Sequence, residues 1–63
     1  MKIKYFQDID TLYIELRAYN VGENRDFDKN TLIDMDEHGE IGAFIIEHAS
    51  ARVDLTKFSF ERV

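Results

Sequence analysis

The chain has 63 residues, with 13 acidic and 8 basic side chains, a formal net charge of -5, and neither cysteine nor proline. A chain of this length buries only about 60% of the surface that its unfolded form exposes, so self-association is a common way to enlarge its core. The composition excludes disulfides and thiolate metal sites, the scattered acidic charge argues against direct nucleic-acid binding, and no apolar stretch reaches the roughly 20 residues of a membrane-spanning helix.

These properties predict one domain over residues 1–63, since the sequence contains no linker, low-complexity tract or repeat. No basic segment followed by an apolar run precedes the first expected strand, so we expect no secretory signal and a cytoplasmic protein. We expect no cofactor and no membrane partner. The acidic surface favours solubility, and the alternative is a basic protein partner.

Two strands are expected at the start of the chain. Residues 1–6 begin with alternating apolar and basic side chains, and residues 11–17 alternate so that Leu12 and Ile14 share one face. Asp8-Ile9-Asp10 supplies turn residues between them. The two segments therefore predict an antiparallel hairpin whose loop is longer than two residues.

The middle of the chain predicts a second hairpin with two alternative registers. Residues 18–24 carry turn residues without an apolar period, and we interpret them as a loop that enters a weak acidic strand at residues 25–28. Lys29-Asn30 then forms a turn into a strand over residues 31–36. A tight turn sets Phe27 opposite Leu32 and Arg25 opposite Asp34, and one extra loop residue sets Phe27 opposite Ile33; both alternatives stay open, because a one-residue slip exchanges the faces of a strand.

A third hairpin is expected around His38-Gly39, because glycine adopts positive φ where the chain reverses. The opposite face would carry Ile41, Ala43 and Ile45, which is too apolar to face water. We therefore expect a second subunit or the C-terminal segment to cover that face. Glu37 and Glu40 would meet as like charges. The predicted pairs are Thr31 with Ile46, Ile33 with Phe44 and Met35 with Gly42.

The C-terminal segment mixes both periods. Residues 49–53 predict a short helix, and the alternation of Phe58-Ser59-Phe60 predicts a short strand. The expected class is α+β and β-rich, with a small antiparallel sheet of four or five strands and a short helical turn near the C-terminus.

Several short motifs follow one another in a characteristic order along nearly the whole chain. They are Tyr5, Asp10, Leu12-Tyr13-Ile14, Asp34-Met35-Asp36, Gly39 and Ile46-Glu47-His48-Ala49-Ser50, followed by Asp54 and Phe58-Ser59-Phe60. In this order they resemble the small prokaryotic domain-of-unknown-function family 2283, although Phe6, Thr11 and Met35 replace an aspartate, an alanine and an aromatic residue of its pattern. The resemblance implies a compact antiparallel sheet with little helix and no established activity. It also suggests that this protein is the component that partners the toxin in a toxin and antitoxin pair.

Asp34-x-Asp36-x-His38-Gly39 superficially imitates the opening of a calcium-binding loop. Such a loop needs oxygen ligands at alternate positions, a glycine at the sixth position and a bidentate glutamate at the twelfth. Counting from Asp34, the twelfth position is Ile45. The interpretation that we favour is a pair of acidic residues near the end of a hairpin.

Glu47-His48-Ala49-Ser50 brings a carboxylate, an imidazole and a hydroxyl together in sequence. These groups can serve acid-base or nucleophilic chemistry, but adjacent strand residues point to opposite faces, so a bend would be needed. The structural alternative is that Ser50 caps a short helix and His48 makes a hydrogen bond at the strand end.

Tyr5, Tyr13 and Tyr19 suggest either an aromatic binding surface or ordinary cross-strand packing. Burial of Tyr13 on the face away from Leu12 would require a partner, which a homodimer supplies. We therefore predict a non-enzymatic, self-associating interaction module. The alternatives are an antitoxin-like inhibitor of a small basic toxin and a metal-dependent or hydrolytic mini-enzyme that uses His48. The candidate binding residues are Tyr13, Asp34, Asp36, Glu47, His48 and Ser50, and no residue is assigned as catalytic or metal-binding.

Overall fold

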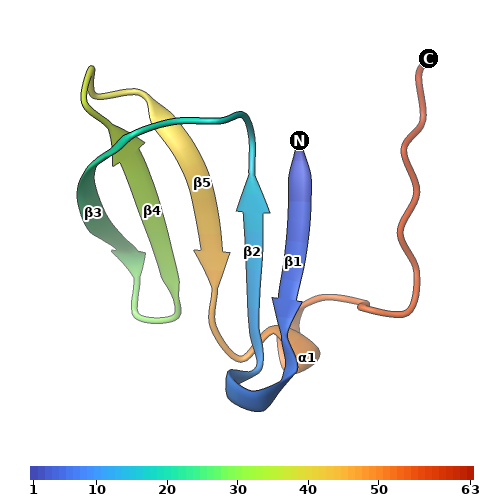
Figure 1. Cartoon of the computed structure of the whole chain (residues 1–63). Coiled ribbons are helices and arrows are strands. Elements are labelled where there is room, and N and C mark those ends of the chain that lie inside the picture. Colours follow the sequence, from blue (N-terminus) through green and yellow to red (C-terminus); the bar gives the residue numbers. More distant parts are fainter.

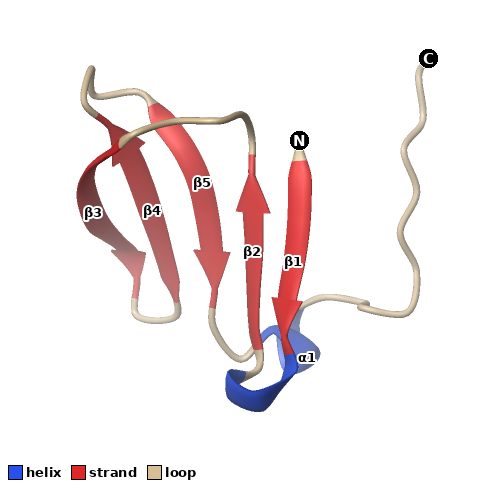
Figure 2. Ribbon diagram, viewed as in Figure 1, coloured by secondary structure: helices blue, strands red, loops and turns tan.

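Five antiparallel strands form one sheet in the computed structural model, which describes all 63 residues (Figures 1 and 2). The order across the sheet is β1-β2-β5-β4-β3. This arrangement confirms the β-rich class, with one short helix near the C-terminus. No helix is long and apolar enough to cross a membrane. The elements are β1 (Lys2–Phe6), the 3-10 helix η1 (Gln7–Ile9), β2 (Thr11–Glu15), β3 (Val21–Asp28), β4 (Thr31–Asp36), β5 (Ile41–Ile46) and α1 (Ala49–Arg52).

The N-terminal hairpin forms as predicted. β1 pairs with β2 in the register that sets Ile3 opposite Ile14 and Tyr5 opposite Leu12. The loop contains η1 and ends at Asp10, whose φ of 50° lies in the left-handed region that aspartate tolerates better than most residues. β2 ends at Glu15, two residues earlier than expected, because the chain turns away from the sheet after the Leu16 amide donates to the carbonyl of Gly42 (2.8 Å).

Strand β3 is longer than predicted and differs in register. It begins at Val21, inside the segment expected to be a loop. Asp28 pairs with Thr31 across the tight turn, but a bulge at Phe27 sets Arg25 opposite Ile33. Both predicted registers are therefore wrong beyond the turn, because a bulge places two residues of one strand against one residue of its partner.

The hairpin of β4 and β5 confirms two of its three predicted pairs. Thr31 lies opposite Ile46 and Ile33 opposite Phe44, but Met35 pairs with Ile41 because the register shifts at Gly42. Gly39 has the expected positive φ of 81°. The amide of Asp36 donates to the carbonyl of Glu40 (2.7 Å), so the predicted opposition of Glu37 and Glu40 is wrong.

The connection between β2 and β3, residues 16–20, crosses the ends of β5 and β4 (Figure 1). It brings Tyr19 onto the backbone of Gly42, where an added Cβ would lie 2.5 Å from a ring carbon. Ala43, next to this contact, is fully buried. The cover expected here from a second subunit or from the C-terminal segment is thus supplied in part by this connection.

The C-terminal segment forms α1, as predicted, but no strand at residues 58–60. A strand needs a neighbour for its amide and carbonyl groups, and none of the backbone hydrogen bonds involves residues 58–63. We call residues 54–63 the arm. Figure 1 shows that it runs apart from the sheet, on the β1 side.

The hydrophobic core is small. Its buried apolar side chains are Leu12, Ala43 and Ala49, and thirteen larger apolar residues are exposed. A single sheet has two faces to cover, and this chain has too few residues to cover both completely.

Candidate functional site

Asp10 is the centre of a hydrogen-bonded cluster at the β1–β2 loop. One carboxylate oxygen accepts bonds from the Tyr5 hydroxyl (2.6 Å) and the Ser50 amide (3.0 Å), and the other accepts from the Ser50 hydroxyl (2.7 Å). The Ala49 amide donates to the Asp10 carbonyl (2.9 Å). The Tyr5 hydroxyl, followed by Ser50, lowers the pKa of Asp10, and the same contact with Asp10 raises the pKa of Tyr5. The cluster fastens the start of α1 to the first hairpin.

The prediction that Ser50 caps the helix and that His48 makes a hydrogen bond is wrong. His48 occupies the N-cap position of α1 with a left-handed φ of 53° and makes no side-chain cap bond. Its side chain makes none of the hydrogen bonds of the structure and is exposed, so the bond predicted for it is not formed. Ser50 does not cap the helix; Asp10 holds its amide and hydroxyl instead. The hydroxyl therefore faces a carboxylate and not the imidazole, while the Glu47 amide donates to the Asn30 carbonyl (2.9 Å).

A second cluster lies on the opposite face of the sheet, where Tyr13 and Tyr19 meet. Their hydroxyls are 2.5 Å apart, the Tyr19 hydroxyl donates to Asp34 (2.9 Å), and Asn24 donates to the other oxygen of Asp34 (2.6 Å). Burial first, then the contacts with Tyr13 and Asp34, raise the pKa of Tyr19. The Lys4 ammonium lies 5.9 Å from the centre of the Tyr13 ring. Tyr13 is thus half-buried by contacts within its own chain, so its position gives no reason for a dimer.

Asp36 organises the β4–β5 turn. One carboxylate oxygen accepts bonds from the amides of His38 (2.8 Å) and Glu40 (2.9 Å), and the other pairs with Arg17 (3.0 Å). The Glu40 amide is the main cause of the lowered pKa of Asp36. Asp34 and Asp36 therefore serve different contacts, and no three His, Cys, Asp or Glu side chains are grouped to hold a metal ion.

Arg52 joins α1 to the β3–β4 turn. Its guanidinium donates to the Asn30 carbonyl (2.6 Å) and to the Thr31 hydroxyl (2.8 Å), and it lies 4.0 Å from Asp28. Sequence reasoning did not select this residue as part of a site. It also did not select Asp10 or Asn24, whose partners lie 40 and 10 residues away, and it named Tyr19 only as part of a possible aromatic surface. The sequence did contain one signal of the Tyr19 contact. A glycine inside a strand, here Gly42, often marks the close approach of another segment.

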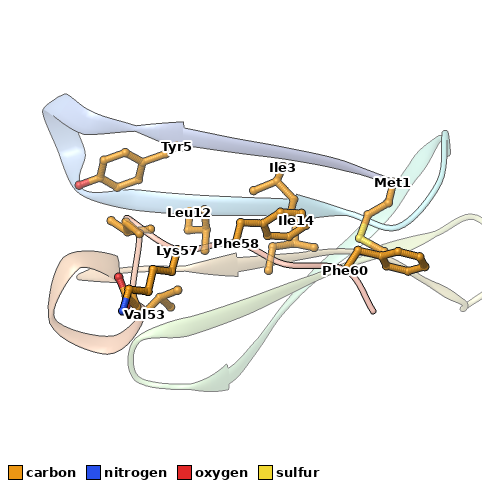
Figure 3. A pocket seen from close by; sticks show the side chains of 11 residues that line it. Met1, Ile3, Tyr5, Leu12, Ile14, Val53, Lys57, Phe58 and Phe60 are labelled. Carbon is orange, nitrogen blue, oxygen red and sulfur yellow. The ribbon is translucent and has the colours of Figure 1, made fainter. Parts of the chain in front are cut away.

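An apolar groove separates the arm from one face of β1 and β2 (Figure 3). Its volume is about 700 Å³, and nine of its eleven lining residues are hydrophobic. Of the two aromatic residues that the arm contributes, Phe58 is 75% exposed and Phe60 76% exposed. The groove is therefore open, and its walls are incompletely covered. The lining residues are Met1, Ile3, Tyr5, Leu12, Ile14, Val53, Asp54, Leu55, Lys57, Phe58 and Phe60.

Comparison with known proteins assigns the chain to a family. The sequence profile of the family described as protein of unknown function (DUF2283) matches residues 2–50. The chain belongs to this family. The match confirms the resemblance for the motifs from Tyr5 to Ser50 and includes the whole sheet, whereas Asp54 and Phe58-Ser59-Phe60 lie outside it. Within the DUF2283 match, Tyr5, Asp10 and Ser50 are partners in one cluster, whereas the arm lies outside it. No curated protein and no solved structure matches the chain.

Proposed function

We propose that this DUF2283 chain is a non-enzymatic, self-associating interaction module, and that the apolar face of its sheet is the contact surface. The alternation of the paired strands places one set of apolar side chains on this face, and the groove lies over its β1–β2 half. A homodimer in the cytoplasm is the proposed working state. The residues of the apolar face are Ile3, Tyr5, Leu12, Ile14, Ile33, Phe44 and Ile46.

The main support for the proposal is that the chain exposes more surface than a compact monomer of its mass. The chain of 7.4 kDa exposes 5066 Å², whereas a compact monomer of this mass is expected to expose about 4,200 Å². The surplus of about 850 Å² is close to the roughly 800 Å² that each partner buries in a standard protein interface. Face-to-face association of two copies would therefore bring the exposed area to that of an ordinary compact protein.

The two edges of the sheet are less suited than the face to symmetric association. Two copies of the β1 edge would bring Lys2 and Lys4 close to the same residues of the other copy. The β3 edge carries Glu23, Asp26 and Asp28 and has two register shifts. Like charges and bulges both oppose strand pairing between identical edges, so the face is the favoured surface.

Sedimentation velocity over a concentration series tests this function with two variants of the same strand. Ile3→Ser alters the apolar face and Phe6→Ser the opposite face, and these side chains are similarly exposed, at 42% and 45%. We expect the wild type and Phe6→Ser to dimerise and Ile3→Ser to dimerise more weakly.

Three results would contradict the proposal. They are a strict monomer at high micromolar concentration, equal weakening by the two variants, and a ladder of species larger than the dimer. The last would indicate that the basic β1 edge pairs with the acidic β3 edge of another copy, because such head-to-tail contacts do not close.

The acidic β3 edge favours a second candidate function, inhibition of a small basic toxin in the manner of an antitoxin. All eight residues of β3 are exposed, and an exposed edge can accept a strand from a partner. If a small basic protein is encoded beside this chain, replacement of Glu23 and Asp26 by their amides should weaken its binding. The Ile3→Ser variant is the control, because it should leave that binding unchanged.

A further inference from the structure

The base of the arm is fixed to the rest of the chain. Arg52 holds the end of α1 on the β3–β4 turn, and the Val53 amide donates to the Ala49 carbonyl (2.8 Å). Asp54 then accepts bonds from the amide (3.1 Å) and hydroxyl (2.7 Å) of Thr56, and its carbonyl accepts from the Lys57 amide (3.4 Å). This turn sets the direction in which the arm leaves the helix.

The tip of the arm does not close the groove. Leu55, near the base, is 37% exposed, whereas Phe58 and Phe60 keep about three quarters of their surface in solvent. Figure 3 shows Phe58 and Phe60 among the side chains that line the groove, together with Ile14 and Met1. The groove is apolar on both sides, since the strands supply Ile3 and Leu12 and the arm supplies its aromatic rings.

Two movements could fill this groove, and they differ in what they disturb. If the arm folded inward on its own chain, residues 58–63 would have to change their path, because the arm runs apart from the sheet. A second copy could instead insert apolar side chains while the arm keeps its path. The arm of each chain presents two such side chains, Phe58 and Phe60. Each phenylalanine buries about 150–250 Å² when it enters an apolar site.

We infer that the groove receives the Phe58 and Phe60 side chains of a second copy, reciprocally, so that each arm completes the apolar face of its partner. The inference rests on the proposed self-association and specifies how it is made. Two phenylalanines supply roughly 300–500 Å² of apolar contact per chain, a large part of the surplus of exposed surface.

Disulfide trapping tests the inference directly, because the chain contains no cysteine of its own. The Phe60→Cys protein is mixed with Ile3→Cys protein, with Ile14→Cys protein or, as the control, with Phe6→Cys protein from the opposite face. After mild oxidation, peptide mass spectrometry identifies which chains are joined. We expect disulfides between different chains for Ile3 or Ile14, and at least several-fold less product for Phe6.

A second measurement follows association itself. The double variant Phe58→Ser/Phe60→Ser should raise the dimer dissociation constant by roughly a hundredfold or more, since two aromatic side chains are lost from an apolar contact. Phe6→Ser should leave it nearly unchanged, and circular dichroism should show both variants folded.

The possible failures are distinguishable. If the protein dimerises but mixed disulfides are absent, or if the double variant Ile3→Cys/Phe60→Cys closes only within one chain, the arm inference is wrong and self-association stands. If the wild type is monomeric throughout, both proposals are wrong.

Discussion

The two faces of the sheet differ in how far the chain itself completes them. On the face of Tyr13 and Asp34, the β2–β3 connection brings Tyr19 into contact with both residues and with the bare backbone of Gly42. On the apolar face, the arm stands beside the sheet and leaves a groove. Polar groups of the first face find their partners within the chain, whereas the apolar area of the second exceeds what 63 residues can cover. The difference teaches that self-association is expected on one face alone.

The largest effect is expected where the completed face is most tightly packed. Gly42→Ala would place a Cβ 2.5 Å from the Tyr19 ring, so the β2–β3 connection must move. We expect the free energy of unfolding to fall by about 1–3 kcal/mol, as for other overpacked sites. Urea denaturation measures it. If Tyr19→Ala in the same chain does not relieve part of this loss, the Tyr19 contact is not its cause.

A smaller effect is expected from the hydroxyl pair on the same face. Tyr19→Phe removes the donor to Asp34 and the partner of the Tyr13 hydroxyl, and should destabilise the protein by about 1 kcal/mol. Tyr13→Phe is the matched control, because it leaves the bond from Tyr19 to Asp34 in place. Equal losses from the two variants would show that the bond to Asp34 contributes little.

The Asp10 cluster joins the apolar face, through Tyr5, to α1, and its effect should depend on pH. The pKa of Asp10 in the folded protein lies below the ordinary value of 3.8. Asp10 therefore stabilises the fold above that value, and this stabilisation is lost as the pH falls through its lowered pKa. Asp10→Asn should reduce the drop in urea midpoint on acidification, while the lowered pKa values of Asp28, Asp36 and Asp54 preserve the remainder. An unchanged acid dependence would rule out this role.

The smallest effect on the monomer is expected at the open face. Phe58→Ser changes a side chain that is mostly in solvent, so the stability of the dilute protein should change by no more than about 0.5 kcal/mol. The measurement is urea denaturation at a concentration below that of dimer formation. A loss as large as that of Gly42→Ala would mean that the arm closes on its own sheet, and the contrast between the faces would disappear.

Local pattern predicted the three hairpins and the short helix, because alternation, turn residues and the positive φ of Gly39 are encoded in neighbouring residues. It failed at Phe27 and Gly42, where bulges shift the register, and at Phe58-Ser59-Phe60, where an alternating pattern has no neighbouring strand. Within the candidate site, it selected Tyr13, Asp34, Asp36 and Ser50 but not their partners Asn24, Arg17 and Asp10, and it named Tyr19 only as part of a possible aromatic surface. Those partners lie up to 40 residues away, and spacing along the chain does not report such contacts.

The sequence by itself determined the family, the β-rich class and the turns, since each depends on residue order or on backbone preferences within a few positions. Only the tertiary structure decided that β2 pairs with β5, that Asp10 holds Ser50, and which face remains open. These outcomes depend on which distant segments of the chain pack against one another. The path of the whole chain decides whether a side chain contacts a partner or remains in solvent. Tyr19 and the arm show both results: Tyr19 packs over Gly42 on its own face, and the arm leaves Phe58 and Phe60 mostly in solvent.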